Sequence, residues 1–289
     1  MKRCPLCSAG HDSFDWTCPV CGFVPERLAH FPLLAPELAK GGGRFKPETF
    51  AELACLEDGN FWFKARNRLI VWALRRYFPH MQRYLEIGCG TGFVLAGVAA
   101  AYPLARLTGS EVFSVGLSHA ARRVAKAELL QMDARHIPYV EEFDVIGAFD
   151  VLEHINEDEA VLAEMLGVLH PGGGVVLTVP HHPRLWSRQD EYACHVRRYR
   201  AGELREKVLR AGFKVQFETS FVSLLLPAMI ASRRVQGKAA ADSDPLAELR
   251  LPGLLNSVFG GVMKAEHLLI RCGVRFPAGG SLMLVAIKP

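Results

Sequence analysis

The stretch Leu85-Glu86-Ile87-Gly88-Cys89-Gly90-Thr91-Gly92-Phe93 decides how this chain folds. Strand-forming residues lead into three glycines at alternate positions, and helix-forming residues follow from Val94 to Ala101. Glycine permits a sharp turn and lets a ligand approach the backbone without meeting a Cβ atom. The start of the following helix presents free N–H groups. The stretch therefore predicts a strand, a turn and a helix, either as a ligand site or as an ordinary glycine-rich turn.

Glu111 follows this turn at a distance of about twenty residues, where nucleotide-binding βαβ units carry an acid that accepts from ribose hydroxyls. The glycine spacing is Gly-x-Gly-x-Gly, whereas a turn that cradles a pyrophosphate has the spacing Gly-x-Gly-x-x-Gly. If the stretch is a ligand site, we therefore expect a cofactor that contains ribose and adenine.

The composition favours one large domain with a small appendage, since the chain has 289 residues of which 50% are hydrophobic. The net charge of +4, from 34 basic and 30 acidic residues, gives no clear nucleic-acid signal. The segment Met1–Pro5 lacks the apolar region of a signal peptide, and no apolar run is long enough for a membrane span. Eight cysteines without an export signal lead us to expect a reducing, cytoplasmic location.

Two C-x-x-C pairs occupy the first thirty residues. Each pair is typical of a tight turn that points two thiolates at one metal, and four thiolates suit structural zinc. Free thiols or two disulfides are the alternatives. We expect residues 1–30 to form a zinc-ribbon-like module that resembles a pair of rubredoxin-like knuckles and depends on the metal for most of its folding energy. The expected ligands are Cys4, Cys7, Cys18 and Cys21.

Residues 31–46 have a linker composition, with two prolines and three consecutive glycines. Helices are expected over 47–56 and 61–78. The second of these lies in a segment, 60–85, that contains basic residues and no acidic residue. Most of this charge is expected to form a solvated face, although a helix lying near an anionic group is the alternative. The basic residues are Lys64, Arg66, Arg68, Arg75, Arg76 and Arg83.

Short strands and helices then alternate, which is the pattern of a parallel α/β sheet. Strands are expected over 106–109, 128–132, 143–149 and 175–179, with a break at 171–174 before the last. Ligands of such sheets bind beyond the carboxyl ends of the strands. Polar residues fall at each of these ends, so we expect them to share one pocket: Glu86 to Gly92, Glu111, Asp133, Asp150 to His154 and Pro180 to His182.

Taken together, these motifs resemble those of class I S-adenosylmethionine-dependent methyltransferases. The matching pieces are Glu86 to Gly92, Glu111, Asp133-Ala134, Phe143-Asp144-Val145, Leu152 to Ile155 and Leu169 to Gly173. Glu111 stands where aspartate is commoner, and His170 where lysine or arginine is. The resemblance implies a Rossmann-like seven-stranded sheet within residues 47–289.

The resemblance also implies S-adenosylmethionine as the cofactor. The glycine turn and two acids would hold its methionine part, Glu111 its ribose, and Asp133 with the backbone of Ala134 its adenine. The implied cofactor-binding residues are Glu86, Gly88, Cys89, Gly90, Gly92, Phe93, Glu111, Asp133, Ala134 and Asp150.

Two histidines are candidates for the chemistry, because an acceptor hydroxyl or amine must lose a proton to a base. His154 ends the motif Asp150-x-x-Glu153-His154, and similar clusters bind a divalent metal in ubiquinone-type O-methyltransferases. A metal held by Asp150, Glu153 and His154 is one reading, and a structural His–Glu pair is the other. His195 either faces the acceptor or ties down its own loop.

An insertion over residues 220–280 separates the last two expected strands, 213–219 and 281–288. Its apolar character suggests a cap over a hydrophobic acceptor or a peripheral membrane contact, while mutual packing of its helices is the alternative.

The sequence therefore predicts a methyltransferase that acts on a small, hydrophobic acceptor, most readily at oxygen. One alternative is a methyltransferase that modifies a protein or RNA gripped by the zinc ribbon, which would make the ribbon a protein-partner site. The other alternative is a non-catalytic scaffold that only binds S-adenosylmethionine.

Overall fold

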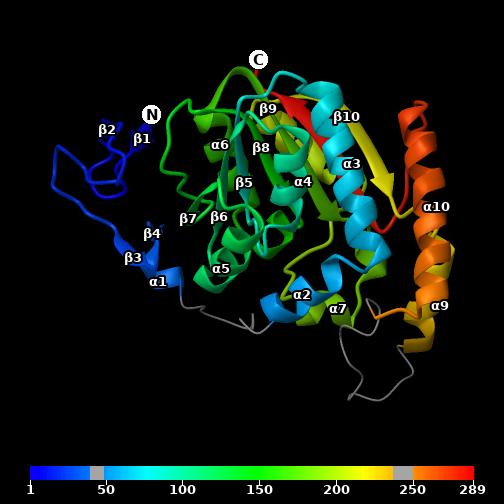
Figure 1. Ribbon diagram of the computed structural model, residues 1–289. Helices are drawn as coiled ribbons and strands as arrows, with labels where there is room; N and C mark the ends of the chain where they lie inside the picture. The colour runs from blue at the N-terminus through cyan, green and yellow to red at the C-terminus, as the bar shows by residue number, and fades with distance from the viewer. Residues whose placement is uncertain (40–48, 237–249) are drawn as a thin grey trace.

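The computed structural model describes residues 1–39, 49–236 and 250–289, and its centre is a twisted sheet with helices on both faces (Figure 1). The strand order is β10-β11-β9-β8-β5-β6-β7-β4-β3. β11 runs antiparallel to both of its neighbours, while β5 to β9 are parallel. The first seven strands of this order form the expected methyltransferase sheet: β5 (Arg83–Ile87), β6 (Arg106–Glu111), β7 (Glu128–Gln131), β8 (Phe143–Phe149), β9 (Leu169–Pro180), β10 (Lys214–Phe221) and β11 (Ser281–Ile287).

Alternate residues of the central strands supply two hydrophobic cores, one on each face of the sheet. In β8, Val145 packs into one core and Ile146 into the other, and both side chains are fully buried. This alternation follows from the pleat of a strand. One core is covered by α3 (Phe61–Tyr77), α4 (Phe93–Ala101) and α5 (Ser114–Arg123), and the other by α6 (Asp158–Val168) and α8 (Glu203–Arg210).

The break expected at 171–174 is instead a bulge inside β9. Phe143 pairs with Leu169 and Val145 with Gly174, so the segment between Leu169 and Gly174 is longer than the segment it faces. Gly172 has a φ of 79°, which allows the chain to loop out and rejoin the sheet. The proline and glycines that suggested a break thus shape the strand without ending it.

Residues 1–30 form two tight turns and the small sheet of β1 (Lys2–Arg3) and β2 (Gly10–His11). This module is fastened to the main domain. Arg3 donates to Ile137 O at 2.8 Å and to Glu164 Oε2 at 2.7 Å, and the buried ring of Trp16 packs edge-on against Tyr139 at 5.2 Å.

Part of the expected linker 31–46 is regular structure. β3 (Glu26–Leu28) pairs with β4 (Phe31–Leu33), and β4 joins the edge of the sheet where Leu33 pairs with Gln131 of β7. The short helix α1 (Pro36–Ala39) follows, and the three glycines fall outside the described residues. The sheet therefore has two strands more than the expected seven.

The insertion before β11 contains α9 (Leu226–Gln236) and α10 (Gly253–Arg271). α10 lies beside α3, with Phe61 against Phe259 and Trp72 against His267 (Figure 1). Two further helices, α2 (Thr49–Glu57) and α7 (Arg188–Tyr192), lie at the carboxyl ends of the central strands. In the described part of the chain, no helix combines the length and the apolarity needed to cross a bilayer.

Candidate active site

A cavity of about 530 Å³ opens at the carboxyl ends of β5 and β8. The glycine turn, the segment after β8, and residues from α2, α3, α7, α9 and α10 line it. Of the polar strand-end residues expected to share one pocket, the following line this cavity: Glu86, Gly88 to Thr91, Asp150, Glu153, His154 and Pro180. Glu111, Asp133, His181 and His182 do not.

The glycine turn has backbone angles that suit glycine. Gly88, Gly90 and Gly92 have φ values of 67°, 53° and 79°, in the left-handed region that L side chains rarely adopt. A Cβ atom on Gly92 would lie 2.8 Å from Cα of Ala120 in α5, which is closer than real contacts. The turn can thus pack against α5 only as glycine.

Glu86 lies at the end of β5 and is 2% exposed, although it lines the cavity. Burial raises the pKa of its carboxyl group to about 8, while a hydrogen bond from Tyr84 Oη at 3.3 Å and the charge of Arg66 oppose that shift. Glu86 is therefore neutral near pH 7 when the site is empty, and a cationic ligand would favour its ionised form.

Glu111 ends β6 directly beside the glycine turn. Its carboxylate accepts from Gly90 N at 3.0 Å and from Phe113 N at 3.2 Å, and burial raises its pKa. Asp133 is held by Arg135, whose Nε lies 3.0 Å from both carboxylate oxygens. Burial alone would raise the pKa of Asp133, but hydrogen bonds from Arg135 lower it. Glu111, Asp133 and Ala134 do not line the cavity, so their roles toward ribose and adenine stay predictions.

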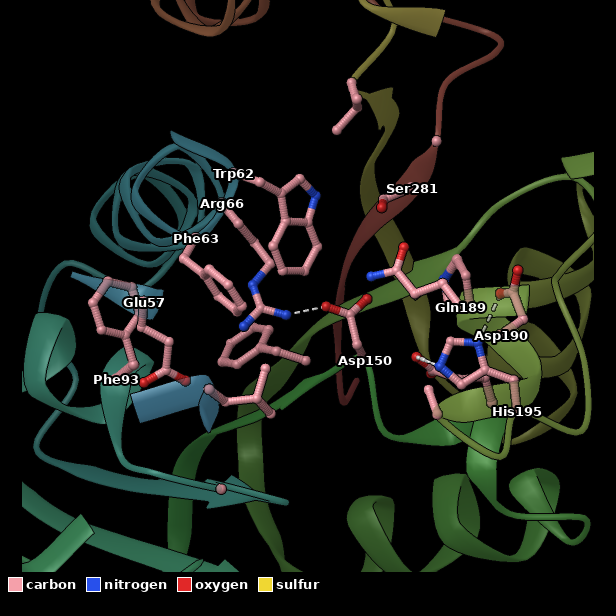
Figure 2. Close-up of a pocket in the computed structure, with 18 of the residues that line it drawn as sticks. Glu57, Trp62, Phe63, Arg66, Phe93, Asp150, Gln189, Asp190, His195 and Ser281 are labelled. Atoms are coloured by element: carbon pink, nitrogen blue, oxygen red, sulfur yellow. Dashed lines mark hydrogen bonds and ion pairs between the residues drawn. The ribbon is translucent and has the colours of Figure 1, made fainter. Parts of the chain in front are cut away.

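Asp150 occupies a strained position after β8, with a φ of 58°. Its carboxylate forms an ion pair with Arg66 of α3, and the guanidinium of Arg66 lies 4.5 Å from the ring of Trp62. Figure 2 shows Asp150 in the middle of the cavity, between Arg66 and His195. Among the basic residues of α3, Arg66 therefore faces an anionic group, the carboxylate of Asp150. The sequence analysis gave a basic helix near an anionic group as the alternative to a solvated face.

His195 and Asp190 form a hydrogen-bonded pair opposite Arg66 (Figure 2). Nδ1 of His195 lies 2.9 Å from Oδ1 of Asp190, and Nε of Arg198 donates to the same oxygen at 2.7 Å. Burial raises the pKa of Asp190, but the hydrogen bond from His195 and the charge of Arg198 lower it to about 2. Because the carboxylate can only accept, Nδ1 of His195 is the donor in this hydrogen bond.

The expected metal set Asp150, Glu153 and His154 is not brought together, because Asp150 pairs with Arg66. His195 takes its place: ligand atoms of Glu153, His154 and His195 lie within 4.8 Å of one another. Glu153 has 0% exposure, and among the described residues neither of its carboxylate oxygens has a hydrogen-bond partner. Burial and the charge of Asp150 raise its pKa well above the usual value. Carboxylate and imidazole groups are suitable ligands for a divalent ion. The same arrangement is equally consistent with a metal-free site in which Glu153 is a neutral carboxylic acid beside two imidazoles.

The ring of His154 borders open space and lies 4.8 Å from the ring of His195, centroid to centroid. Its pKa is lowered, because surrounding protein atoms displace water from the ring and because His195 disfavours a second proton nearby. His154 is therefore a neutral imidazole in the cavity wall.

A cluster that the sequence analysis missed connects α2 to the glycine turn. Glu57 accepts from Thr91 Oγ1 at 2.8 and 2.6 Å and forms an ion pair with Arg123 of α5. Phe50 of the same helix approaches Gly90, with its Cε1 3.8 Å from where a Cβ would stand. Nothing in the local pattern of α2 marks Glu57, since its two partners lie 34 and 66 residues away.

The far wall of the cavity is apolar and comes from the insertion. Val222, Leu225 and Met229 line it near α9, and Leu255 and Phe259 of α10 close it. This wall faces the polar side that contains Asp150 and His195, so the cavity suits a ligand with an apolar body and a polar end.

The four cysteines of the N-terminal module meet the geometric demands of one metal. The Sγ atoms of Cys4 and Cys21 lie 3.7 Å apart, as do those of Cys7 and Cys18. Zinc–sulfur bonds of ~2.3 Å in a tetrahedron separate the sulfurs by about 3.8 Å, whereas a disulfide needs ~2.05 Å. A hydrogen bond from the Cys21 backbone N–H lowers the pKa of Cys18 to about 6 despite the opposing effect of burial, which favours a thiolate.

Comparisons with known proteins agree with this architecture. Residues 85–177 match the family model described as "Methyltransferase domain". A probable S-adenosylmethionine-dependent methyltransferase from Mycolicibacterium smegmatis is 26% identical over 167 residues, which cover 56% of this chain and 62% of that protein. A ubiquinone biosynthesis O-methyltransferase from Aromatoleum aromaticum is 30% identical over 105 residues, which cover 32% of this chain and 42% of that protein.

Among solved structures, the cyclase SpnF superposes with a TM-score of 0.53 and 22% identity, covering 79% of this chain and 83% of its own. The family model matches residues 85–177, and the strand order is that of the Rossmann-like methyltransferase fold. The matched segment spans less than two thirds of either curated relative, and a similar fold occurs in a cyclase, so the fold alone does not fix the reaction.

Proposed function

We propose that this protein transfers a methyl group from S-adenosylmethionine to a hydroxyl group of a small, largely apolar acceptor. The observation that carries the proposal is the position of the His195–Asp190 pair on the same cavity as the glycine turn. The two curated relatives reported above are named as methyltransferases, one of them an O-methyltransferase. The apolar wall from α9 and α10 supports an acceptor with a hydrophobic body.

The residues have separate roles in this proposal. When bound in this cavity, S-adenosylmethionine would supply an electrophilic methyl group, and S-adenosylhomocysteine would be the leaving group. His195 Nε2 accepts the proton that the hydroxyl loses, while Asp190 holds the ring in the tautomer with a free Nε2. The turn Gly88 to Gly92 and Glu86 would surround the methionine end. Arg66 orients Asp150 at the centre of the cavity through their ion pair.

Two measurements test the proposal. Titration calorimetry with S-adenosylmethionine is expected to show binding to one site per chain, and no heat at millimolar cofactor would exclude both enzyme and cofactor-binding scaffold. Incubation of a cell extract with methyl-labelled cofactor, followed by mass spectrometry, is expected to show label in a small molecule. Label found only in protein or RNA would instead favour the alternative in which the ribbon grips a macromolecule.

The ribbon supports a second, structural part of the proposal. We infer that Cys4, Cys7, Cys18 and Cys21 bind one zinc ion, because the sulfur separations fit a tetrahedral site. Phe14 and Leu6 of this module are exposed, and they are where a protein partner would bind if the ribbon recruits one.

A divalent ion at Glu153, His154 and His195 is the alternative to a metal-free base. A manganese titration followed by electron paramagnetic resonance distinguishes them. Bound manganese that is lost in Glu153→Gln would favour the metal, and its absence in the wild-type protein would favour the base.

A further inference from the structure

A second cavity, of about 970 Å³, lies between α3 and α10 on the outside of the domain, with two residues of α4 at its border. The two helices run side by side (Figure 1). This space, which we call the α3–α10 groove, is separate from the candidate active site. Its lining includes six exposed cations: Lys64, Arg68, Arg75 and Arg76 from α3, and Lys264 and Arg271 from α10.

The positive charge of the α3–α10 groove is not neutralised by the described part of the chain. α3 contains no acidic residue, and none of the six cations forms an ion pair with a described residue. The one acid of α10, Glu266, has 0% exposure and turns inward, where it accepts from Val222 N, Ser223 N and Leu224 N at 2.7 Å. A surface of this kind is complementary to a partner with several negative charges.

His267 shows the effect of these cations. Burial, together with the charges of Arg271 and Arg68, lowers its pKa to about 4. Its Nε2 atom is buried and has no hydrogen-bond partner among the described residues. The nearby cations thus disfavour a further positive charge on the ring of His267.

Apolar side chains stand exposed on α10 next to the cations. Leu254, Val258 and Leu268 are 81%, 52% and 60% exposed, and Leu268 also lines the groove. Exposed aliphatic side chains beside lysine and arginine are typical of a helix that lies in a membrane interface. Nucleic acid would use the cations but would leave the leucines in water, so the combination favours lipid.

We propose that the face formed by α3 and α10 docks on a membrane surface that contains anionic phospholipids. The cations of the α3–α10 groove contact lipid phosphates, and Leu254 and Val258 enter the acyl boundary. Leu255 and Phe259, from the same helix, line the candidate active site. An apolar molecule dissolved in the bilayer would therefore meet the protein beside that cavity. The docking itself does not depend on the proposed methyl transfer.

Flotation with vesicles tests the proposal on the full-length, zinc-containing protein. We expect the protein to float with vesicles of phosphatidylcholine and phosphatidylglycerol at about 3:1 and to remain free with phosphatidylcholine alone. Raising the salt to about 0.5 M is expected to release it, because screening shortens the reach of surface charges. Since this arm uses unmodified protein, it is informative even if a variant fails to fold.

Two sets of variants identify the face. Lys64→Glu/Arg68→Glu/Arg75→Glu is expected to weaken partitioning on the order of 100-fold, since each cation near an anionic surface contributes roughly a fivefold change. Leu254→Ser/Val258→Ser is expected to weaken vesicle binding. The salt dependence of the remaining binding is expected to stay unchanged, because these variants remove no charge. Controls are Lys126→Glu and Leu104→Ser, which are exposed outside this face and are expected to bind like wild type.

The outcomes separate the alternatives. Absent binding to anionic vesicles, equal binding to neutral ones, or equal losses in the control variants would each overturn the proposal. Tight binding of a short RNA that is lost in the triple variant, without vesicle binding, would assign the groove to nucleic acid instead. Calorimetry with S-adenosylmethionine on the same variants is expected to be unchanged, so failure of docking and failure of the proposed function can be told apart.

Discussion

Oδ1 of Asp190 lies 2.9 Å from Nδ1 of His195 and 2.7 Å from Nε of Arg198, so one buried oxygen fixes both the tautomer of the imidazole and the position of an arginine. The pair belongs to a short segment after β9, where α7 begins at Arg188 and Asp190 also accepts from Ser187 N at 2.8 Å. The histidine is thus oriented by a residue that the local fold already holds in place.

His195→Ala is expected to lower kcat by about 10²–10⁴-fold, since a positioned general base contributes rate enhancements of this size. The affinity for S-adenosylmethionine, measured by calorimetry, is expected to stay within about twofold of wild type. Added imidazole is expected to restore part of the rate, because it can occupy the space and accept the proton. A variant with unchanged kcat would show that His195 only ties down its loop.

Glu86 is expected to make stability depend on pH. Its pKa is about 8 in the fold against an ordinary value of 4.5, so between these values the folded state holds a proton that the unfolded state has released. Stability therefore falls as the pH rises through this window. Between about pH 5 and 8, the free energy of unfolding measured with urea is expected to change less with pH for Glu86→Gln than for wild type. Glu37→Gln, at an exposed position of α1, is the matched control.

Cys18→Ser is expected to remove bound zinc and loosen the ribbon. Structural zinc contributes apparent binding energies of about 10–16 kcal/mol, far more than a thirty-residue segment gains from its own core. The measured zinc content is expected to fall from one ion per chain to none. The fluorescence emission of Trp16, which is 2% exposed in the folded protein, is expected to shift to the red. Cys55→Ser, an exposed cysteine outside the cluster, is expected to retain the metal.

Glu57→Gln is expected to destabilise the fold by about 3 kcal/mol, because it leaves the largely buried guanidinium of Arg123 without its carboxylate. Binding of S-adenosylmethionine is expected to weaken as well, since Thr91 of the glycine turn loses the same partner. The double variant Glu57→Gln/Arg123→Met is expected to recover part of the loss. Strictly additive effects in chemical unfolding would contradict a coupled cluster.

The sequence predicted those parts of the fold that depend on local periodicity. The strands from β5 to β9 are buried apolar runs that end at polar residues, and the glycine turn requires backbone angles that few other residues adopt. The position of the cavity followed from these ends, because parallel strands bring their carboxyl ends to one edge. His195 was identified as a candidate from its place in the chain.

Features that depend on distant partners could not be predicted in this way. β4 has three residues with a proline at its centre, and its pairing is decided by Gln131, almost a hundred residues away. One of the two readings of the sequence placed Asp150 in a metal site with Glu153 and His154, because their spacing is helical. The backbone at Asp150 instead has a positive φ, and its side chain pairs with Arg66. Residues at positions i, i+3 and i+4 share one face only if the segment that contains them is helical.

The attachment of β4 to β7 has a consequence for the behaviour of the protein when zinc is scarce. Leu33 pairs with Gln131, Leu34 N donates to Gln131 O at 2.9 Å, and the Gln131 side chain bonds the backbone of Ala35 in both directions. The N-terminal segment therefore covers what would otherwise be an open sheet edge. If the ribbon unfolds and β4 leaves, unpaired backbone groups of β7 become available to strands of other molecules. Metal starvation would then appear first as self-association rather than as loss of cofactor binding.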